Sequence, residues 1–482
     1  MQWFIHLKCT AMQERIIGRH NELQLLAKYM QTPRSEFIAV YGRRRVGKTF
    51  LVRHAIGKEA CISVTGMENV LLDEQLANFY ISLRKVYPSA VRCSSWLEAF
   101  DQLEQYLESL PKGNKILFFD ELPWFDTPRS NFVSALEHFW NNWASARSDI
   151  KLVTCGSAAS WMLDHLINNH GGLHNRVTHQ MLIEPFSLKE CKEYFDAYDF
   201  GYQVREVAEY YMVFGGVPYY LSLMNRDESV AQNVDRLIFS ATGELSAERT
   251  NLFRSLFKRS TDYVTIVEAL SAKRKGLTRK ELLDATRLDN NQRFSTMLQE
   301  LENCRFIRQY LPYSGKKRDI TYQLIDPFLH FSLQVQAKCK YQDENYWSHS
   351  INSPIYNAWS GFAFEMLCLN HVPQIKAALK IEGVQTSVYC WRTPAQAERG
   401  AQIDLLIDRA DHCVNLCEMK FCRGKYTITK AEREKIENRM QSFIAYSKTK
   451  SSIRLIMITS FGVEKNTNSG IIQNELTLED LF

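Results

Sequence analysis

The sequence predicts an α/β protein made of several domains, and three observations lead to this prediction. The chain has 482 residues, more than one hydrophobic core usually organises. Residues 37–56 have the pattern of a strand, a glycine-rich turn and a helix. Residues 402–420 have the pattern of two apolar strands around a polar turn. We therefore expect one sheet near the N-terminus and another near the C-terminus.

The composition is typical of a globular protein in water. Hydrophobic residues make up 45% of the chain and charged residues 23%, and the net charge of +5 permits nucleic-acid binding without arguing for it. No apolar run reaches the roughly 18 residues that span a bilayer, and residues 3–7 are too short for a signal peptide. We expect a cytoplasmic protein with reduced cysteines and no membrane partner. Residues 1–11 fit no element, and we expect them to be an extension before Met12.

The glycine-rich turn matches the pattern GxxxxGK[ST] from Gly42 through Gly47 to Lys48 and Thr49. Glycines let backbone N–H groups turn toward phosphates, and the following helix adds the positive end of its dipole. Lys48 would reach the β- and γ-phosphates, and Thr49 would offer its hydroxyl to Mg²⁺. The pattern predicts an ATP site. We expect the three arginines of residues 43–45 to face solvent or a partner rather than the phosphates.

A second motif supports this site. The apolar run 116–119 has the composition of a strand buried on both faces, and it ends in Asp120 and Glu121. An acid at the carboxyl end of a parallel strand lies at the crevice where ligands bind. We expect Asp120 to hold Mg²⁺ through its water shell and Glu121 to polarise the attacking water. A pair of acids at a helix start is the alternative.

A third strand is predicted just before Gly156 and Ser157. A polar side chain in this position could sense the γ-phosphate. A serine that follows a strand also commonly caps the next helix. Both roles stay open for Ser157.

Several further motifs follow one another along the N-terminal half of the chain. In order they are IIGRHNEL, GRRRVGKT, DELPWF, CGS, NRV followed by IEPFSLKE, and GGVPYYL. With these motifs, residues 17–221 resemble the archaeal-type ATPase family, a branch of the AAA+/STAND P-loop ATPases.

The resemblance implies a P-loop ASCE/AAA+-like parallel sheet in residues 12–180, a helical lid in residues 181–250, and assembly into homo-oligomers as one option. It makes Arg176 a candidate finger or sensor arginine, with a surface or salt-bridge role as the alternative. It places Gly215, Gly216 and Pro218 in the lid, where we expect them to shape the backbone.

The order of helical and β-like patterns in residues 251–335 predicts a winged helix-turn-helix. Helix one has an apolar stripe from Tyr263 to Leu270, and Thr278 with Glu281 forms a capping box for helix two. A third helix and two β-like runs around a basic turn complete the pattern. Phosphate contact and a packing or protein-contact role both stay open. The basic residues that favour phosphate contact are Lys273, Arg274, Lys275, Arg279, Lys280, Arg293, Lys316, Lys317 and Arg318.

The C-terminal hairpin carries polar side chains within apolar strands. If its turn is centred on Asp411, then Asp404 and Glu418 lie directly opposite one another on the same face. Lys420 follows two residues later and shares that face. Facing carboxylates repel unless a cation lies between them, so this arrangement predicts a divalent metal, with Lys420 positioning water or stabilising developing charge.

This pattern resembles the PD-(D/E)XK nuclease superfamily, and the resemblance covers about residues 355–482, within a predicted domain of residues 350–482. It implies a restriction-endonuclease-like α/β fold and adds Glu365, on an apolar helix, to the metal ligands Asp404 and Glu418. The domain could be an active nuclease or an inactive one that binds DNA or protein. His412 and the cysteines near it have poor spacing for zinc, so strand packing explains them better.

The combined expectation is an ATPase that acts on nucleic acid, with DNA and ATP as partners, ATP and Mg²⁺ as cofactors, and a metal-dependent nuclease-like tail. The alternative is a nucleotide-dependent switch whose winged helix and inactive nuclease-like domain only bind DNA or a protein. The Glu365–Asp404–Glu418–Lys420 set distinguishes the two.

Overall fold

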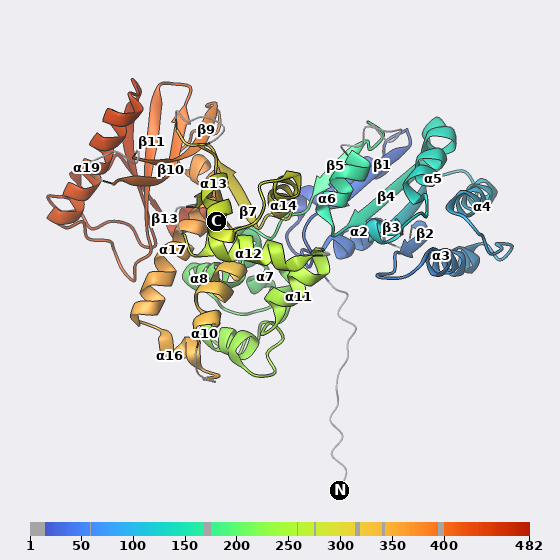
Figure 1. Ribbon diagram of the computed structural model, residues 1–482, viewed down its shortest axis with the longest axis horizontal. Coiled ribbons are helices and arrows are strands. Elements are labelled where there is room, and N and C mark those ends of the chain that lie inside the picture. Colours follow the sequence, from blue (N-terminus) through green and yellow to red (C-terminus); the bar gives the residue numbers. More distant parts are fainter. Residues whose placement is uncertain are drawn as a thin grey trace, which may run out of the picture. The chain divides into compact units, whose positions relative to one another are not determined.

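The computed structural model describes residues 15–57, 59–167, 175–257, 259–273, 276–313, 319–339, 343–393 and 400–482. The chain divides into two compact units, which are described separately (Figure 1). The first unit contains the chain through Tyr41, Gly47–Gly156 and Trp161–Ile183. The second contains Gly42–Val46, Ser157–Ser160 and Glu184–Phe482. Two short segments that follow strands of the first unit therefore group with the second.

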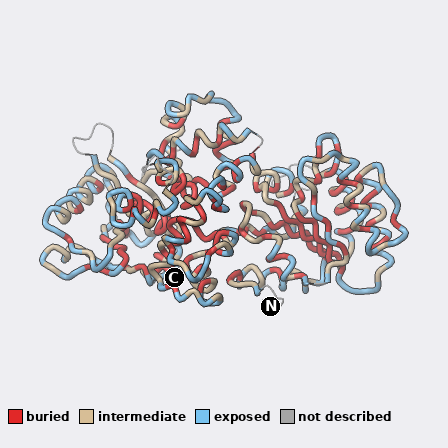
Figure 2. Tube along the Cα trace, turned by 90° about the horizontal axis from the view of Figure 1, so that it is seen from below, coloured by how far each residue is buried: buried red, intermediate tan, exposed pale blue. Residues whose placement is uncertain are grey.

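The first unit is built on a five-stranded parallel sheet with the strand order β2-β3-β4-β1-β5. Strand β4 lies between β1 and β3, so the two strands that precede the predicted phosphate motifs are not adjacent. Strands β3 and β4 are buried along their whole length, as their apolar sequences predict, and Figure 2 shows the sheet as a band of buried residues. The strands are β1 (Glu36–Tyr41), β2 (Ala60–Thr65), β3 (Lys115–Asp120), β4 (Ile150–Gly156) and β5 (His179–Leu182).

The helices of this unit pack against one another and on β3 through aromatic side chains, and the Phe100 ring lies 6.2 Å from Phe119 of β3. Trp96 and Phe100 contact Phe132 and Phe79, with ring centroids 5.0–6.2 Å apart. Ser95 caps the helix that contains Trp96, because its side chain accepts a hydrogen bond from the Glu98 N–H. The helices are α1 (His20–Met30), α2 (Lys48–Ile56), α3 (Leu72–Val86), α4 (Trp96–Ser109), α5 (Phe132–His138) and α6 (Ala159–Met162).

The second unit begins with a helical segment where the lid is predicted. Its helices are α7 (Leu188–Ala197), α8 (Val204–Phe214), α9 (Pro218–Ser222), α10 (Val230–Val234) and α11 (Glu248–Leu256). Gly215 ends α8 with a φ of 62°, in the left-handed region. Gly216 packs so closely on Phe186 that a Cβ would lie 1.8 Å from the Phe186 carbonyl oxygen. Both glycines therefore shape the backbone.

The next segment contains the three helices and the hairpin expected between Tyr263 and Ile325. Thr278 and Glu281 form the predicted capping box at the start of the second helix. A three-stranded antiparallel sheet has the order β6-β8-β7. The elements are α12 (Ser260–Ser271), β6 (Leu277–Thr278), α13 (Arg279–Thr286), α14 (Gln292–Asn303), β7 (Ile307–Tyr310) and β8 (Thr321–Leu324).

The C-terminal part contains helices followed by a mixed sheet of order β13-β12-β11-β10-β9. The hairpin β10–β11 pairs Leu405 with Cys417 and Arg409 with Cys413, so its centre is Asp411, as predicted. Strands β11, β12 and β13 run parallel. The elements are α15 (Pro327–Gln334), α16 (Tyr346–Ser350), α17 (Pro354–Asn370), α18 (Val372–Ala378), β9 (Thr386–Arg392), β10 (Gln402–Arg409), β11 (Cys413–Lys420), α19 (Lys430–Ser447), β12 (Ser452–Thr459) and β13 (Asn474–Thr477).

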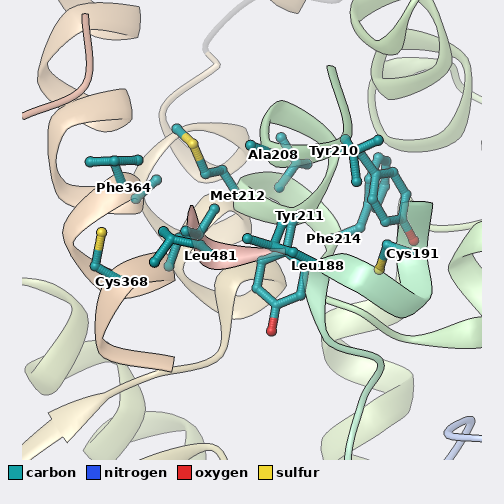
Figure 3. Packing of buried hydrophobic residues seen from close by; sticks show 14 of the residues in the cluster. Leu188, Cys191, Ala208, Tyr210, Tyr211, Met212, Phe214, Phe364, Cys368 and Leu481 are labelled. Atoms are coloured by element: carbon teal, nitrogen blue, oxygen red, sulfur yellow. The ribbon is translucent and has the colours of Figure 1, made fainter. Parts of the chain in front are cut away.

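One hydrophobic core of the second unit joins the helices after β5 to α15, α17 and the C-terminal sheet, while the helices α11–α14 have a core of their own. Tyr211 and Phe214 of α8 belong to the same buried cluster as Phe364 of α17 and Leu481 near the C-terminus (Figure 3). A buried polar contact accompanies it, because His371 accepts a hydrogen bond from the Leu188 N–H at 3.1 Å. In the described segments, no helix is long and apolar enough to cross a bilayer.

Candidate functional site

The predicted phosphate loop connects β1 to α2. It leaves β1 after Tyr41 and enters α2 at Lys48, so strand, loop and helix follow in the predicted order. Gly47 precedes the helix with a φ of 86°, which glycine adopts without steric cost. The N-terminus of α2 offers backbone N–H groups and the positive end of its dipole, which together suit an anion. Lys48 is buried at this helix start.

The loop helix and the acid pair come together within the first unit. The Thr49 hydroxyl donates a hydrogen bond to Asp120 Oδ1 at 2.9 Å, although 71 positions separate the two residues in the sequence. Asp120 is the last residue of β3 and is buried. The structure therefore unites the two motifs that the sequence singles out.

The environment of Asp120 suits a hard cation. Burial raises the pKa of its carboxyl above the ordinary value, and the hydrogen bond from Thr49 and the Arg53 charge only partly offset this effect. A nearby divalent cation would favour the ionised form instead. Hydroxyl and carboxylate oxygens are the ligand types that Mg²⁺ takes beside nucleotide phosphates. Thr49 and Asp120 therefore fit the predicted Mg²⁺ site in donor type and in mutual distance.

Glu121 has an unusual backbone. It directly follows β3 and adopts a φ of 50°, in the left-handed region that non-glycine residues rarely occupy. Its N–H donates to the Asp120 carboxylate at 3.2 Å, which ties the two acids together. Such conformations cost of order 1–3 kcal/mol and are concentrated at functional sites. The sequence alone gives no sign of this conformation.

The other two predicted nucleotide-site residues are less well defined. Ser157 directly follows β4 and is half-buried, and its short segment groups with the second unit. Arg176 is exposed in a turn before β5. Their roles in sensing or catalysis stay predictions.

The arginines of the loop correct one expectation. Arg43 does not face solvent or a partner, because it is buried and ion-paired with Asp326 inside the second unit. Arg45 is half-buried and ion-paired with the buried Glu248. Arg44 is half-buried. The sequence could not reveal these pairings, because the partners lie more than 200 residues away.

A second polar site lies in the C-terminal part. All four residues predicted there, Glu365, Asp404, Glu418 and Lys420, line one pocket of about 610 Å³. Glu365 comes from α17, and the other three come from the hairpin β10–β11. The hairpin pairs Leu405 with Cys417, and the same register extended by one residue sets Asp404 opposite Glu418.

The two facing carboxylates already have partners. Glu418 is buried and forms an ion pair with Arg439 of α19. Asp404 accepts a hydrogen bond from the Gln402 side chain. Mutual repulsion of the acids is therefore relieved by the protein itself, which the sequence interpretation did not anticipate.

Glu365, Asp404 and Glu418 are the predicted metal ligands of this pocket. The three carboxylates are hard oxygen donors, as Mg²⁺ requires. Within the part of the chain that the structure describes, however, no three His, Cys, Asp or Glu side chains form a metal-binding group. Glu365, Asp404 and Glu418 share a pocket without forming such a group, so their role as joint ligands stays a prediction. Cys413 and Cys417 are buried in β11, in line with the packing interpretation.

One face of α19 lines this pocket, although no sequence motif singled its residues out. Four of its polar side chains line the same pocket at spacings i, i+3, i+4 and i+7, which is one face of a helix. That spacing could have been found, but it acquires meaning only once the helix is known to cover the hairpin. These residues are Lys435, Asn438, Arg439 and Ser442.

The hairpin β7–β8 packs against the C-terminal sheet. Pro312 forms a bridge with Cys390 of β9, and the Tyr313 ring contacts Tyr389 and Phe443 at 5.4 and 5.1 Å. This contact favours the packing role that was left open for the segment. Of the predicted basic residues, Arg274, Lys275, Lys316, Lys317 and Arg318 lie outside the described residues.

The other basic side chains of this segment differ in their surroundings. Lys273 and Lys280 are exposed. Arg279 donates a hydrogen bond to Asn290 at 2.9 Å, and Arg293 is ion-paired with Asp262 at 2.5 Å. Two of the four cations are therefore engaged within the chain.

Three known proteins are similar to this chain over about two thirds of its length or more. An uncharacterised protein of Methanocaldococcus jannaschii is 25% identical over 394 residues, which cover 81% of this chain and 83% of its own. A Walker-type ATPase of Pyrococcus abyssi is 20% identical, with a TM-score of 0.48 over 67% of this chain and 97% of that one. The ORC2 protein of Aeropyrum pernix is 14% identical, with a TM-score of 0.37 over 68% of this chain and 97% of that one.

The family comparison bears directly on the first site. A family model described as an ATPase domain predominantly from Archaea matches residues 16–224. The matched range contains the loop, the Thr49–Asp120 contact and Glu121. Residues 16–224 are therefore similar to the archaeal ATPase domains, and the match supports an ATPase that binds and hydrolyses a nucleotide.

Proposed function

We propose that this protein is an Mg²⁺-dependent ATPase that acts on nucleic acid, with ATP bound at the loop before α2. The observation that carries the ATPase proposal is the 2.9 Å bond between Thr49 and Asp120, which joins the two predicted phosphate motifs. The match of residues 16–224 to an ATPase domain supports it.

The roles of the residues follow from their chemistry. The loop N–H groups and Lys48 bind the phosphates, and Thr49 and Asp120 hold the cation. When bound, Mg²⁺ neutralises charge on the phosphate oxygens. Glu121 orients the attacking water and accepts its proton. Ser157 and Arg176 would sense the γ-phosphate and stabilise the transition-state charge, from the same chain or from a second copy.

The test uses two substitutions with different expected effects. Lys48→Ala removes the charge at the phosphates and should abolish tight ATP binding. Glu121→Gln keeps the shape of the side chain but not its basicity, so it should bind ATP and lose turnover by at least about 10²-fold. Steady-state phosphate release and nucleotide affinity measure the two effects.

A matched control is Glu68→Gln, which changes an exposed carboxylate of the same unit. It should leave both parameters unchanged. Normal ATP turnover in a folded Lys48→Ala protein would show that the loop is not the ATP site. Normal turnover in Glu121→Gln would show that Glu121 does not take part in the reaction.

For the C-terminal part we propose a PD-(D/E)XK nuclease-like domain and, before it, a winged helix. The support is the shared pocket of Glu365, Asp404, Glu418 and Lys420, and the order of helices and hairpin in the preceding segment. If the pocket cuts DNA, its carboxylates hold the cation and Lys420 stabilises developing charge.

The Glu418–Arg439 ion pair favours a second candidate, a nucleotide-dependent switch that binds DNA or protein without cutting. The two candidates differ in their response to Mg²⁺ or Mn²⁺. A nuclease should gain thermal stability with the metal and cleave single- or double-stranded DNA or RNA.

The substitutions that separate the candidates are Asp404→Asn and Lys420→Ala. Asp404→Asn should lose both the metal response and cleavage, whereas Lys420→Ala should lose cleavage alone because an ammonium group is no metal ligand. ATP turnover should survive both changes. If metal does not change the thermal stability of the wild type and no nucleic acid is cleaved in any assay, the nuclease candidate is wrong and the switch candidate stands.

A further inference from the structure

Two arginines of the phosphate loop are fixed by buried carboxylates that lie far along the chain. Arg43 is ion-paired with Asp326, and each side chain is only 3% exposed. Arg45 is ion-paired with Glu248, whose side chain is 2% exposed. All four residues belong to the second unit, because Gly42–Val46 groups with it.

The Arg43 contact lies at a junction of several elements. Asp326 caps α15, since its Oδ1 accepts a hydrogen bond from the Leu329 N–H at 2.7 Å. The Arg43 guanidinium also lies over the Phe306 ring, 5.1 Å from its centroid. Burial alone would lower the pKa of Arg43, but the Asp326 carboxylate raises it above the ordinary value. Removing the Asp326 carboxylate would therefore leave the buried Arg43 charge without its partner.

The Arg45 contact is a second anchor of the same loop segment. The Arg45 guanidinium stacks on Tyr219 of α9 at 4.3 Å, and the Tyr220 hydroxyl donates to Glu248 at 2.9 Å. Arg45 adopts a φ of 72°, a left-handed conformation that surrounding contacts must hold in a non-glycine residue. Its ion pair and ring contact supply that restraint.

We propose that Arg43 and Arg45 are positioning residues: by binding Asp326 and Glu248 they hold the phosphate loop in its nucleotide-receiving conformation. Nucleotide affinity then depends on the start of α15 and on α9, neither of which is a phosphate motif. The inference rests on the proposed ATP site at this loop. By linkage, a nucleotide that binds the held loop must in turn stabilise the Asp326 contact.

The main test is Asp326→Asn in the full chain. Asparagine keeps an oxygen that caps α15 but loses the charge that holds Arg43. We expect the Kd for a fluorescent ADP or ATP analogue to rise about tenfold, equivalent to about 1.4 kcal/mol. The double variant Arg43→Gln with Asp326→Asn should regain thermal stability, because no unpaired charge remains, yet keep the raised Kd.

Asp235→Asn is the matched control. Asp235 is also a buried carboxylate, and it accepts hydrogen bonds from the Trp347 and Ser348 N–H groups at 2.7 and 3.0 Å. This variant should lose stability and keep the wild-type nucleotide Kd. A Kd raised equally by both Asp→Asn variants, or raised by neither, would overturn the positioning role.

Hydrogen exchange supplies a readout that a merely structural role would not move. Nucleotide should slow exchange of the Leu329 amide in the wild type and not in Asp326→Asn. If nucleotide does not change the exchange rate of the Leu329 amide in the wild type, the inference is overturned. A wild-type protein that binds no nucleotide at all would instead overturn the proposed ATP site, and this inference with it.

Discussion

Arg439 controls the charge balance of the C-terminal pocket. Its guanidinium neutralises Glu418, the buried member of the facing carboxylate pair. A divalent cation that takes Glu418 as a ligand would meet the positive charge of this guanidinium at the same carboxylate, so the two cations would compete. The proposed metal affinity of this pocket would then depend on α19 as well as on the hairpin.

Arg439→Gln should therefore strengthen the response to metal while weakening the protein without metal. Loss of the guanidinium leaves a buried carboxylate unpaired, which costs stability until a cation arrives. If Kd for Mn²⁺ falls about tenfold, saturating metal should stabilise the variant by about 1.4 kcal/mol more than the wild type. Thermal unfolding across a Mn²⁺ titration measures this difference.

Arg433→Gln is the control for that experiment. Arg433 lies on the same helix and is ion-paired with Glu437 at 2.8 Å, one turn away, rather than with the hairpin. Its loss should leave the metal response unchanged. An Arg439→Gln protein with the wild-type metal response would show that Glu418 is no ligand.

At the scale of elements, α4 carries a row of acids on one face. Asp101, Glu104 and Glu108 recur at helical spacing, and Glu104 is half-buried among them. Burial first, and then the neighbouring charges of Asp101 and Glu108, raise the pKa of Glu104 to about 7. The folded state therefore binds a proton on Glu104 that the unfolded state releases at lower pH.

Stability should consequently fall as the pH rises from about 4.5 to about 7, because the unfolded state loses this proton first. Glu104→Gln should remove that loss, raising the stability of the first unit above pH 7 by about 1 kcal/mol or less, with little effect near pH 4. Urea unfolding at several pH values checks this. Gln105→Glu, one position along the helix, should not reproduce the effect, and an unchanged pH profile in Glu104→Gln would contradict the expectation.

The elements themselves were largely predictable, whereas their partners were not. Periodicity and capping residues located β1, β3, the capping box at Thr278 and the hairpin centred on Asp411, because these depend on local sequence. The ion pairs of Arg43 and Glu418 depend on residues outside the local sequence, Asp326 and Arg439. A pattern shows that a side chain is polar, but not which buried group will face it.

At the scale of the whole molecule, the segments expected to be lid, winged helix and nuclease-like domain form one unit. The predicted domains are bounded at residues 250, 335 and 350, but apolar faces from α8, α15 and α17 share a core across these boundaries. Periodicity identifies an apolar face and cannot say what covers it. The division into four domains stays a prediction.

His371 makes this unit sensitive to acid. It is buried, accepts a hydrogen bond from the Leu188 N–H and donates one to the Leu367 carbonyl at 2.8 Å, so it is neutral in the fold. Burial lowers its pKa to about 4. The contribution of His371 to the free energy of unfolding is fully present above the unfolded-state pKa of about 6.5. It is lost as the pH falls toward 4, because the unfolded state gains the proton first.

His371→Gln should lower stability near neutral pH and flatten the decline between about pH 6.5 and 4. Urea midpoints of the second unit, followed by tryptophan fluorescence, measure both effects. His54→Gln, which alters an exposed histidine of the first unit, should leave that decline intact. A His371→Gln protein that still declines as steeply would show that another group is responsible.

The junction between Pro312 and Cys390 affects how the C-terminal part would behave on its own. Strand β9 is the outermost strand of its sheet, and the Tyr313 ring covers Tyr389 and Phe443 beside it. A fragment that starts after residue 343 would expose both a strand edge and an aromatic patch. Exposed edges and apolar patches of this kind promote self-association. Soluble expression of this sheet should therefore require at least the polypeptide from the hairpin β7–β8 onward, and a fragment that starts after residue 343 should accumulate as insoluble material.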